Sequence, residues 1–191
     1  MQKNISVIDL FSGPGGLSEG FSQFDNGETF NPFVSVEMDI NACNTLKIRK
    51  LFHFLKNTKH PKLKTYYRYL KSQKSISWDC IKTEFSDVEK IIDNAVWRHE
   101  LGSWPTDDTC NEIRRRLKTL GHRKENEIVL IGGPPCQAYS LIGRSKRSQQ
   151  QEKGTYSPEE DHRNYLYEWY LNILPEFKPA VFIMENVPGI L

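Results

Sequence analysis

The sequence predicts an α/β fold in which helices cover both faces of a mostly parallel sheet. Short apolar runs alternate along the chain with segments of helical periodicity, which is the order expected of strand–helix–strand units. The runs are apolar without interruption, as is typical of strands buried on both faces. The 191 residues fit one domain, which buries roughly 70% of its unfolded surface and needs neither disulfides nor a metal to fold.

The first part of the chain supplies two strands, each followed by a helix. Residues 5–11 (ISVIDLF) form an apolar run bounded by the glycine-rich segment 13–16, which predicts a buried strand ending in a tight turn. Residues 17–24 have apolar positions at helical spacing. Residues 31–38 predict a second strand that ends in acid, and Asp39 is a candidate N-cap for the helix that follows.

The later part of the chain adds two more strands. Residues 51–125 carry no clear pattern, apart from an amphipathic helix at 110–120. Residues 127–131 (EIVLI) predict a strand, residues 164–177 a helix, and residues 179–184 a further strand. In parallel sheets of this kind, ligands bind beyond the carboxyl ends of the strands.

Composition excludes several classes of protein. Charged residues make up 26% of the chain, mean hydropathy is −0.59, and no run approaches the ~18 apolar residues of a spanning helix, so an integral membrane protein is excluded. The first residues lack the apolar core of a secretion signal, and we expect a cytoplasmic protein with reduced thiols. No cysteine pair or histidine has the spacing of a metal site. Three thiols are expected to be small hydrophobic residues: Cys43, Cys80 and Cys110.

Charge is segregated along the chain although the net charge is only +2. Residues 44–83 contain eleven Lys or Arg and one acid, Asp79, whereas residues 84–112 contain eight acids and two bases. Two interpretations stand: the basic block is a solvated helix face, or it lies against a polyanion.

The first predicted strand end is a glycine turn. A turn of this kind between a strand and a helix allows a ligand to approach the backbone closely, and it also serves as a purely structural turn. Glu37 lies about twenty residues further on, at the end of the second strand, where a carboxylate can accept hydrogen bonds from a ribose diol or simply face solvent. The adjacent Met38 is placed to cover an adenine face.

Two further strand ends carry reactive side chains. In the segment 133–137 (GPPCQ), two prolines fix the backbone just before Cys136, which is either a buried thiol or a rigidly mounted nucleophile. Glu185 and Asn186 follow the last predicted strand. A carboxyl at this edge can hold its proton and hydrogen-bond a base ring nitrogen, or it can cap a helix or pair with a cation.

Together these residues resemble the C5-cytosine DNA methyltransferase family. Five stretches occur in the family's order: DLFSGPGG at 9–16, VEMD at 36–39, GGPPCQAYSLIGR at 132–144, DHRNYL at 161–166 and MENVPGIL at 184–191. The resemblance implies a Rossmann-like, S-adenosylmethionine-dependent fold and transfer of a methyl group to carbon 5 of cytosine in double-stranded DNA, as part of a restriction-modification system.

The resemblance also implies roles for single residues. It makes Cys136 the nucleophile that adds to carbon 6 of a flipped cytosine, with Glu185 and Asn186 as its partners. The loop after the cysteine would contact DNA through Gln137, Ser140, Arg144, Lys146 and Arg147. S-adenosylmethionine would be held by Phe11, Gly13, Gly15, Gly16, Leu17, Glu37, Met38, Pro135 and Leu166.

The sequence departs from the family pattern in three ways. No acid for the adenine amine can be placed with certainty, and Glu100 is the candidate. The long separation of Glu37 from Cys136 predicts an insertion at about 51–125, either a DNA-facing surface or a helical buttress. The Arg-x-Arg element, the target-recognition domain and the segment that returns to the cofactor domain are not found, so residues 1–191 are expected to form an incomplete catalytic domain with exposed apolar surface near Leu191.

Three functional alternatives remain open at this point. The chain is a catalytic domain of a cytosine-5 DNA methyltransferase, or a truncated or split half that works with a separate C-terminal half. It could instead be a non-catalytic partner that keeps the motifs. The third reading is a methyltransferase that acts on cytosine in RNA.

Overall fold

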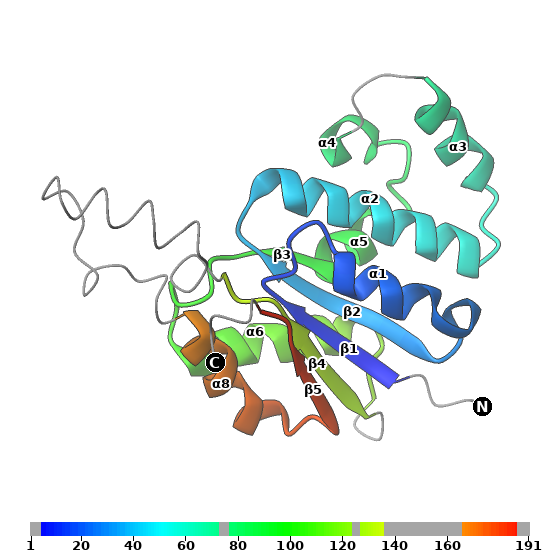
Figure 1. Cartoon of the computed structure of the whole chain (residues 1–191). Coiled ribbons are helices and arrows are strands. Elements are labelled where there is room, and N and C mark those ends of the chain that lie inside the picture. The colour runs from blue at the N-terminus through cyan, green and yellow to red at the C-terminus, as the bar shows by residue number, and fades with distance from the viewer. Residues whose placement is uncertain (1–4, 73–76, 124–126, 136–165, 187–191) are drawn as a thin grey trace, which may run out of the picture.

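The computed structural model describes residues 5–72, 77–123, 127–135 and 166–186. Figure 1 shows a twisted sheet with helices packed on both of its faces. In chain order the elements are β1 (Ile5–Leu10), α1 (Gly16–Gln23), η1 (Phe24–Gly27), β2 (Phe30–Glu37), α2 (Ile40–Asn57), α3 (Leu63–Lys71), α4 (Trp78–Ile81), α5 (Glu89–Ala95), β3 (Val96–Arg98), α6 (Thr106–Thr119), β4 (Ile128–Gly132), α8 (Leu166–Phe177) and β5 (Val181–Met184).

The sheet has the order β3-β2-β1-β4-β5, and every strand pairs in parallel with its neighbours. The predicted fold class, a parallel sheet between helices in a Rossmann-like arrangement, is therefore confirmed. β1 is central: Asp9 lies opposite Ser35 of β2 and Ile131 of β4. Because all strands run the same way, the segments that follow them gather at one edge.

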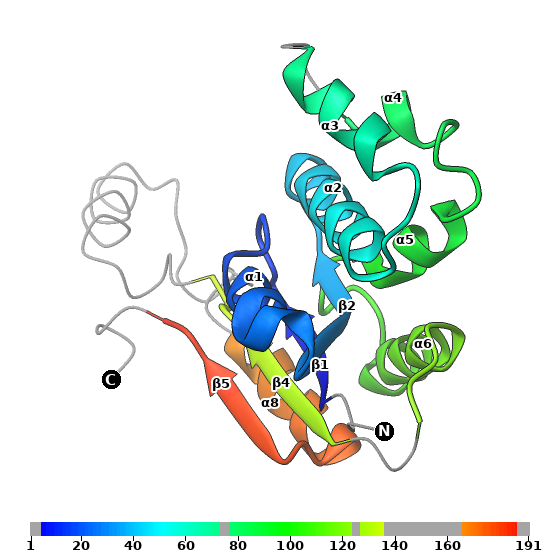
Figure 2. The ribbon, with the colours of Figure 1, turned by 90° about the vertical axis from the view of Figure 1, so that its right-hand side faces the viewer.

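Helices cover both faces of the sheet (Figure 2), and apolar side chains pack between the helices and the strands on each face. On one face, Ile8 and Leu10 of β1 pack with Ile113 of α6 and Tyr170 of α8. On the other face, Val7 packs with residues of α1, while residues of α2 cover β3. The alternation of buried side chains along β1 between these two faces explains why its sequence is apolar throughout.

Tyr170 joins the last two strands from the middle of α8. Its side chain is fully buried, and its hydroxyl lies 3.0 Å from the carbonyl oxygen of Leu130 in β4 and 3.1 Å from that of Ile183 in β5. Burial raises the pKa of the phenol, so the hydroxyl stays a donor. Gly132 makes room for the ring, since a Cβ there would lie 2.9 Å from Tyr170 and 2.6 Å from the carbonyl oxygen of Leu10.

The predicted insertion at about 51–125 divides into two parts in the structure. Its later part contains β3 and α6, which belong to the sheet and its helical cover. Its earlier part builds α3, α4 and α5 against α2 around a separate apolar cluster that includes Leu51, Tyr66, Trp78 and Phe85. β3 and the three short helices were not predicted from the sequence.

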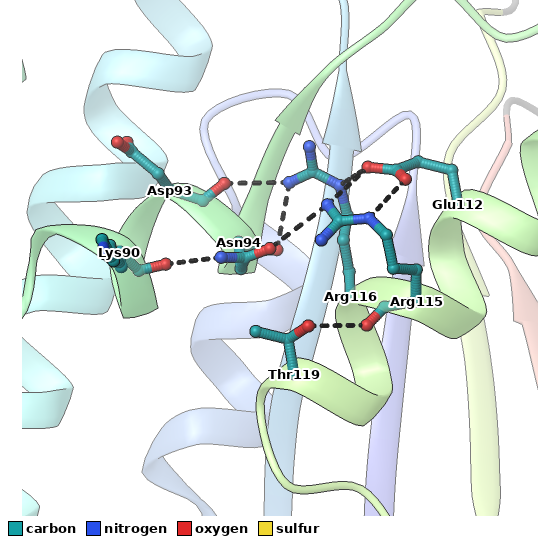
Figure 3. Close-up of polar contacts among 7 residues, drawn as sticks. All are labelled: Lys90, Asp93, Asn94, Glu112, Arg115, Arg116 and Thr119. Carbon is teal, nitrogen blue, oxygen red and sulfur yellow. Dashed lines mark hydrogen bonds and ion pairs between the residues drawn. The ribbon is translucent and has the colours of Figure 1, made fainter.

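A polar network fixes this helical part to the sheet layer (Figure 3). Arg116 of α6 donates to the backbone carbonyl groups of Asp93 and Asn94 at the end of α5, at 2.9 and 3.2 Å. Its guanidinium also pairs with Glu112 at 2.7 Å and lies over the ring of Trp97 in β3. Arg116 thus satisfies carbonyl groups that a helix end leaves open.

One expectation about the cysteines is wrong. Cys43 and Cys110 are buried, and burial raises the pKa of each thiol to about 11, but Cys80 is exposed. α4 is a single turn that points Trp78 and Ile81 into the apolar cluster. Cys80 therefore falls on the outer side of the turn.

The C-terminal edge strand leaves apolar side chains uncovered. Val181, Phe182 and Ile183 of β5 are 52%, 55% and 40% exposed. In the described part of the chain, β5 pairs only with β4. The expected apolar surface near the C-terminal end is therefore confirmed. No helix of the described residues is both long enough and apolar enough to span a membrane.

Replacing Tyr170 with phenylalanine tests the link between β4 and β5. We expect the free energy of unfolding to fall by about 1–2 kcal/mol, because buried carbonyl groups lose a donor while the ring still packs. Urea denaturation of Tyr170→Phe measures the change, and Tyr67→Phe, at an exposed ring of α3, is the matched control. Equal stability of the two variants would contradict the bridging role.

Candidate functional site

The turn between β1 and α1 is shaped by its glycines. Phe11, Gly13 and Gly15 all have positive φ, and the Ser12 hydroxyl anchors the turn 2.8 Å from the carbonyl oxygen of Asp9. At Gly15 a Cβ would lie 2.6 Å from the Leu46 side chain of α2, so a larger residue would force Leu46 to shift and would also be strained by the positive φ. A Cβ at Gly13 or Gly16 would meet nothing within 4 Å, so this side of the turn faces open space.

Glu37 ties the glycine turn to the end of β2. One carboxylate oxygen accepts a hydrogen bond from the backbone amide of Gly13 at 2.8 Å. The other accepts from the amides of Met38 and Asp39, both at 2.8 Å. Asp39 then caps α2, accepting from the amides of Asn41 and Ala42, as predicted. The structure thus brings together the glycine turn and the acid that the sequence selected as a pair.

The end of β3 lies beside Glu37. The amide of His99 donates to the carbonyl oxygen of Glu37 at 2.9 Å, and Glu100 follows as an exposed residue. Met38, the predicted adenine cover, is 56% exposed at the same edge. The carboxyl groups of Glu37 and Glu100 therefore follow neighbouring strands, which is the arrangement that a third-strand acid would need.

The ends of β4 and β5 are in direct contact. A Cβ at Gly133 would lie 3.1 Å from a carboxylate oxygen of Glu185, so the carboxyl group sits against this backbone. The amide of Glu185 donates to the carbonyl oxygen of Gly132 at 2.8 Å, and the Asn186 side chain donates to that of Pro134 at 3.2 Å. Glu185 and Asn186 therefore hold the backbone just before the predicted nucleophile.

The remaining predicted residues fall into two groups. Phe11 and Leu17 pack partly into the core layers on opposite faces of the sheet, and Leu166 is the half-buried first residue of α8. Pro135 is exposed at the end of the segment described for β4. Six predicted residues lie outside the described part of the chain: Cys136, Gln137, Ser140, Arg144, Lys146 and Arg147.

A buried charge lies beneath the turn, and the sequence alone assigned it no role. Asp9 is 1% exposed, and neither carboxylate oxygen has a hydrogen-bond partner in the described structure. Burial raises the pKa of Asp9 to about 6, while the hydroxyl of Ser18 and the charge of Lys50 oppose the rise. Burial lowers the pKa of Lys50, whose amine donates to the carbonyl oxygen of Pro32. In the sequence, the sign of this buried carboxyl group is a single acid, Asp9, within an apolar strand.

In residues 5–72, 77–123, 127–135 and 166–186, no three His, Cys, Asp or Glu side chains are grouped as a metal site would require.

Comparisons with known proteins point to one family. Residues 103–191 match the family model described as C-5 cytosine-specific DNA methylase. The type II methyltransferase M.Bpa9945I of Bacillus paralicheniformis is 36% identical over 97% of this chain and 41% of its own length. M1.HphI of Haemophilus parahaemolyticus is 26% identical over 96% of this chain and 32% of its own length.

A third relative is also matched over nearly the whole of this chain. A putative type II methyltransferase of Methanocaldococcus jannaschii is 26% identical over 97% of this chain and 49% of its own length. This chain therefore spans less than half the length of each of these three relatives.

The buried Asp9 predicts a pH-dependent stability. Its folded pKa of about 6 lies above the ordinary 3.8, so its protonated form stabilises the fold below pH 4, and this contribution is lost as the pH rises through 6. Relative to Asp9→Asn, the wild type should lose up to about 3 kcal/mol of unfolding free energy between pH 4 and pH 7.

Urea denaturation at several pH values measures this difference. Asp108→Asn, on the exposed surface of α6, is the control and should stay within about 0.5 kcal/mol of the wild type. Parallel pH profiles of the wild type and Asp9→Asn would show that the carboxyl group is not buried in the unpaired state described.

Proposed function

We propose that this chain, which is similar over residues 103–191 to the C-5 cytosine-specific DNA methylase family model, forms the cofactor-binding and catalytic part of a cytosine-5 DNA methyltransferase. The observation that carries the proposal is that the glycine turn bound by Glu37 lies at the same edge of the parallel sheet as Glu185 and Asn186. A type II restriction-modification system is the setting suggested by the relatives' names.

The residues at the first two strand ends fit S-adenosylmethionine. The open space beside Gly13 and Gly16 can admit a ligand to the backbone, and the first amides of α1 face the turn. Glu37 uses three of its roughly four lone-pair positions on amides, which leaves one for a ribose hydroxyl. Glu100 is the proposed acid for the adenine amine, and Met38 the proposed cover. The cofactor, when bound, supplies an electrophilic methyl group on a sulfonium sulfur.

Cys136 and Glu185 are proposed to activate the cytosine. The Cys136 thiolate adds to carbon 6, which makes the ring electron-rich at carbon 5 so that this carbon can accept the methyl group. Glu185 hydrogen-bonds ring nitrogen 3 and thereby stabilises the adduct. A base then removes the carbon 5 proton, the carbon 6–sulfur bond breaks and the thiolate leaves. Asn186 supports this corner by holding the carbonyl group of Pro134.

Double-stranded DNA is the proposed partner. The cytosine must leave the stack to reach a residue at a sheet edge, at a cost of a few kcal/mol. Residues Arg144, Lys146 and Arg147 follow the nucleophile in sequence and are proposed to contact the phosphates of that DNA. If DNA is the partner, the protein acts in the compartment that contains the genome.

A second possibility concerns what the domain needs in order to act. The exposed side chains of Val181, Phe182 and Ile183 favour a further protein segment over β5. We propose that this segment is another part of the methyltransferase, in the same polypeptide or in a separate one. On this reading the domain binds the cofactor by itself but methylates DNA only when β5 is covered.

Cofactor binding is tested by calorimetric titration with S-adenosylmethionine. Glu37→Gln should weaken binding at least about tenfold, because its amide group cannot accept from all three backbone amides and from a ribose hydroxyl. Glu28→Gln, at an exposed position before β2, should leave affinity unchanged. Equal affinities for the two variants would remove Glu37 from the site.

The nucleophile is tested with duplex DNA that contains 5-fluorocytosine, which prevents loss of the adduct. We expect a covalent complex in the presence of cofactor, formed by the chain together with the part of the methyltransferase that is proposed to cover β5. Cys136→Ser should give none, and Glu185→Gln should form it at least about 100-fold more slowly. Trapping by Cys136→Ser at the wild-type rate would show that the nucleophile is another residue.

A further inference from the structure

Helix α3 presents a row of cations on its outer side. Lys64, Arg68 and Lys71 are exposed and lie at positions i, i+4 and i+7, which is one face of a helix. We call these three residues the α3 cation row. The helix (LKTYYRYLK) contains no acidic residue. The side chains of Tyr67 and Leu70 are exposed beside the row.

The opposite side of α3 explains why the row is presented outward. Tyr66 is 6% exposed and stacks on Phe52 of α2 with ring centroids 5.6 Å apart. Leu63 and Tyr69 pack against the same apolar cluster. These contacts fix the rotation of the helix, so the cation row cannot turn toward the protein without losing the buried ring.

Nearby acids are already paired with other groups. Asp87 binds Lys62 at 2.7 Å, and Asp79 binds Lys82 at 2.8 Å. Asp93 binds Lys47 at 2.8 Å, and Glu84 accepts from the hydroxyl of Tyr69 at 3.0 Å. No ion pair of the α3 cation row occurs within the described ranges of the chain. Asp87, Asp79 and Asp93 thus neutralise lysines outside the row, and Glu84 is hydrogen-bonded to a tyrosine.

We propose that the α3 cation row binds the phosphate backbone of duplex DNA. The inference rests on the proposed function, which makes DNA the polyanion that this domain meets. α3 lies on the side of α2 away from the sheet in both views, so this surface is distinct from the strand-end site (Figures 1 and 2). The row supplies affinity without reading sequence, because it contacts phosphates and not base edges.

The dimensions of the row suit this partner. Lys64 and Lys71 are seven residues apart, which spans about 10 Å of helix axis. That length corresponds to about three phosphates along one strand at 3.4 Å each. Flexible lysine and arginine side chains can therefore each reach a separate phosphate. The exposed Tyr67 lies within the same face.

The test compares two triple variants with the same change of charge. In the first, the row is neutralised as Lys64→Gln, Arg68→Gln and Lys71→Gln. The control neutralises three exposed cations near the opposite, amino edge of the sheet: Lys118→Gln, Arg123→Gln and Lys178→Gln. Fluorescence anisotropy with a labelled duplex of about 20 base pairs measures affinity over a range of salt concentrations.

We expect the row variant to bind DNA at least about tenfold more weakly at ~0.1 M salt, with a salt slope shallower by about 2–3. The control should bind within about twofold of the wild type. Similar affinity for the row variant and the control would overturn the proposal, as would a wild type that does not bind duplex DNA.

Two readouts separate this inference from the proposed function. The row variant should keep the wild-type thermal unfolding midpoint and affinity for S-adenosylmethionine, since its residues are exposed and lie far from the glycine turn. Loss of cofactor binding and of the fluorocytosine adduct in the wild type would refute the proposed function. Loss of DNA affinity confined to the row variant would support the row.

Discussion

The parallel direction of all five strands is the constraint on which the rest of the structure depends. Because each strand must end at the same edge, residues separated by up to about two thirds of the sequence follow adjacent strands. The β1–β4 pairing sets the glycine turn beside Gly133, and the β4–β5 pairing sets Glu185 against that same glycine. Each of these contacts involves backbone atoms. A change in the register of the strands would therefore also change the geometry of the site.

Some glycines of the site allow other parts of the protein to approach the backbone closely, and others leave open space beside it. At Gly15 the neighbour is Leu46 of α2, and at Gly132 it is the carbonyl oxygen of Leu10 with the ring of Tyr170. At Gly13 and Gly16 the space is open instead. The first kind of glycine positions the site through packing, whereas the second kind leaves room for a ligand. The same turn therefore contains both the support of the site and its opening.

Sequence pattern predicts β1, β2, β4 and β5 because each is a short apolar run. The interior positions of β1 and β4 are buried, whereas β5 is apolar although its side chains are exposed. It does not predict β3, whose three residues gain strand structure only from pairing with β2. Glu37 could be selected from its position, but its bonds to Gly13, Met38 and Asp39 depend on how two turns meet. The electrostatic influence of Lys50 on Asp9 acts between residues 41 positions apart, so only the solitary acid is visible in the sequence. Cys80 shows the same limit, since a one-turn helix has too few residues for a periodicity to reveal its inner side.

Helix α2 connects the site to the charged surface. It begins at the Asp39 cap, directly after the carboxylate that binds the glycine turn, and its 18 residues span about 27 Å. Along one side it contributes Leu46 beneath Gly15, and along the other it supports α3 through Phe52. Substitutions on the exposed side of α3 can therefore change the surface charge without disturbing the glycine turn, as long as the Phe52–Tyr66 stack is kept. This separation explains how a domain with a net charge of only +2 can concentrate cations on one surface while its acids hold the remaining helices together.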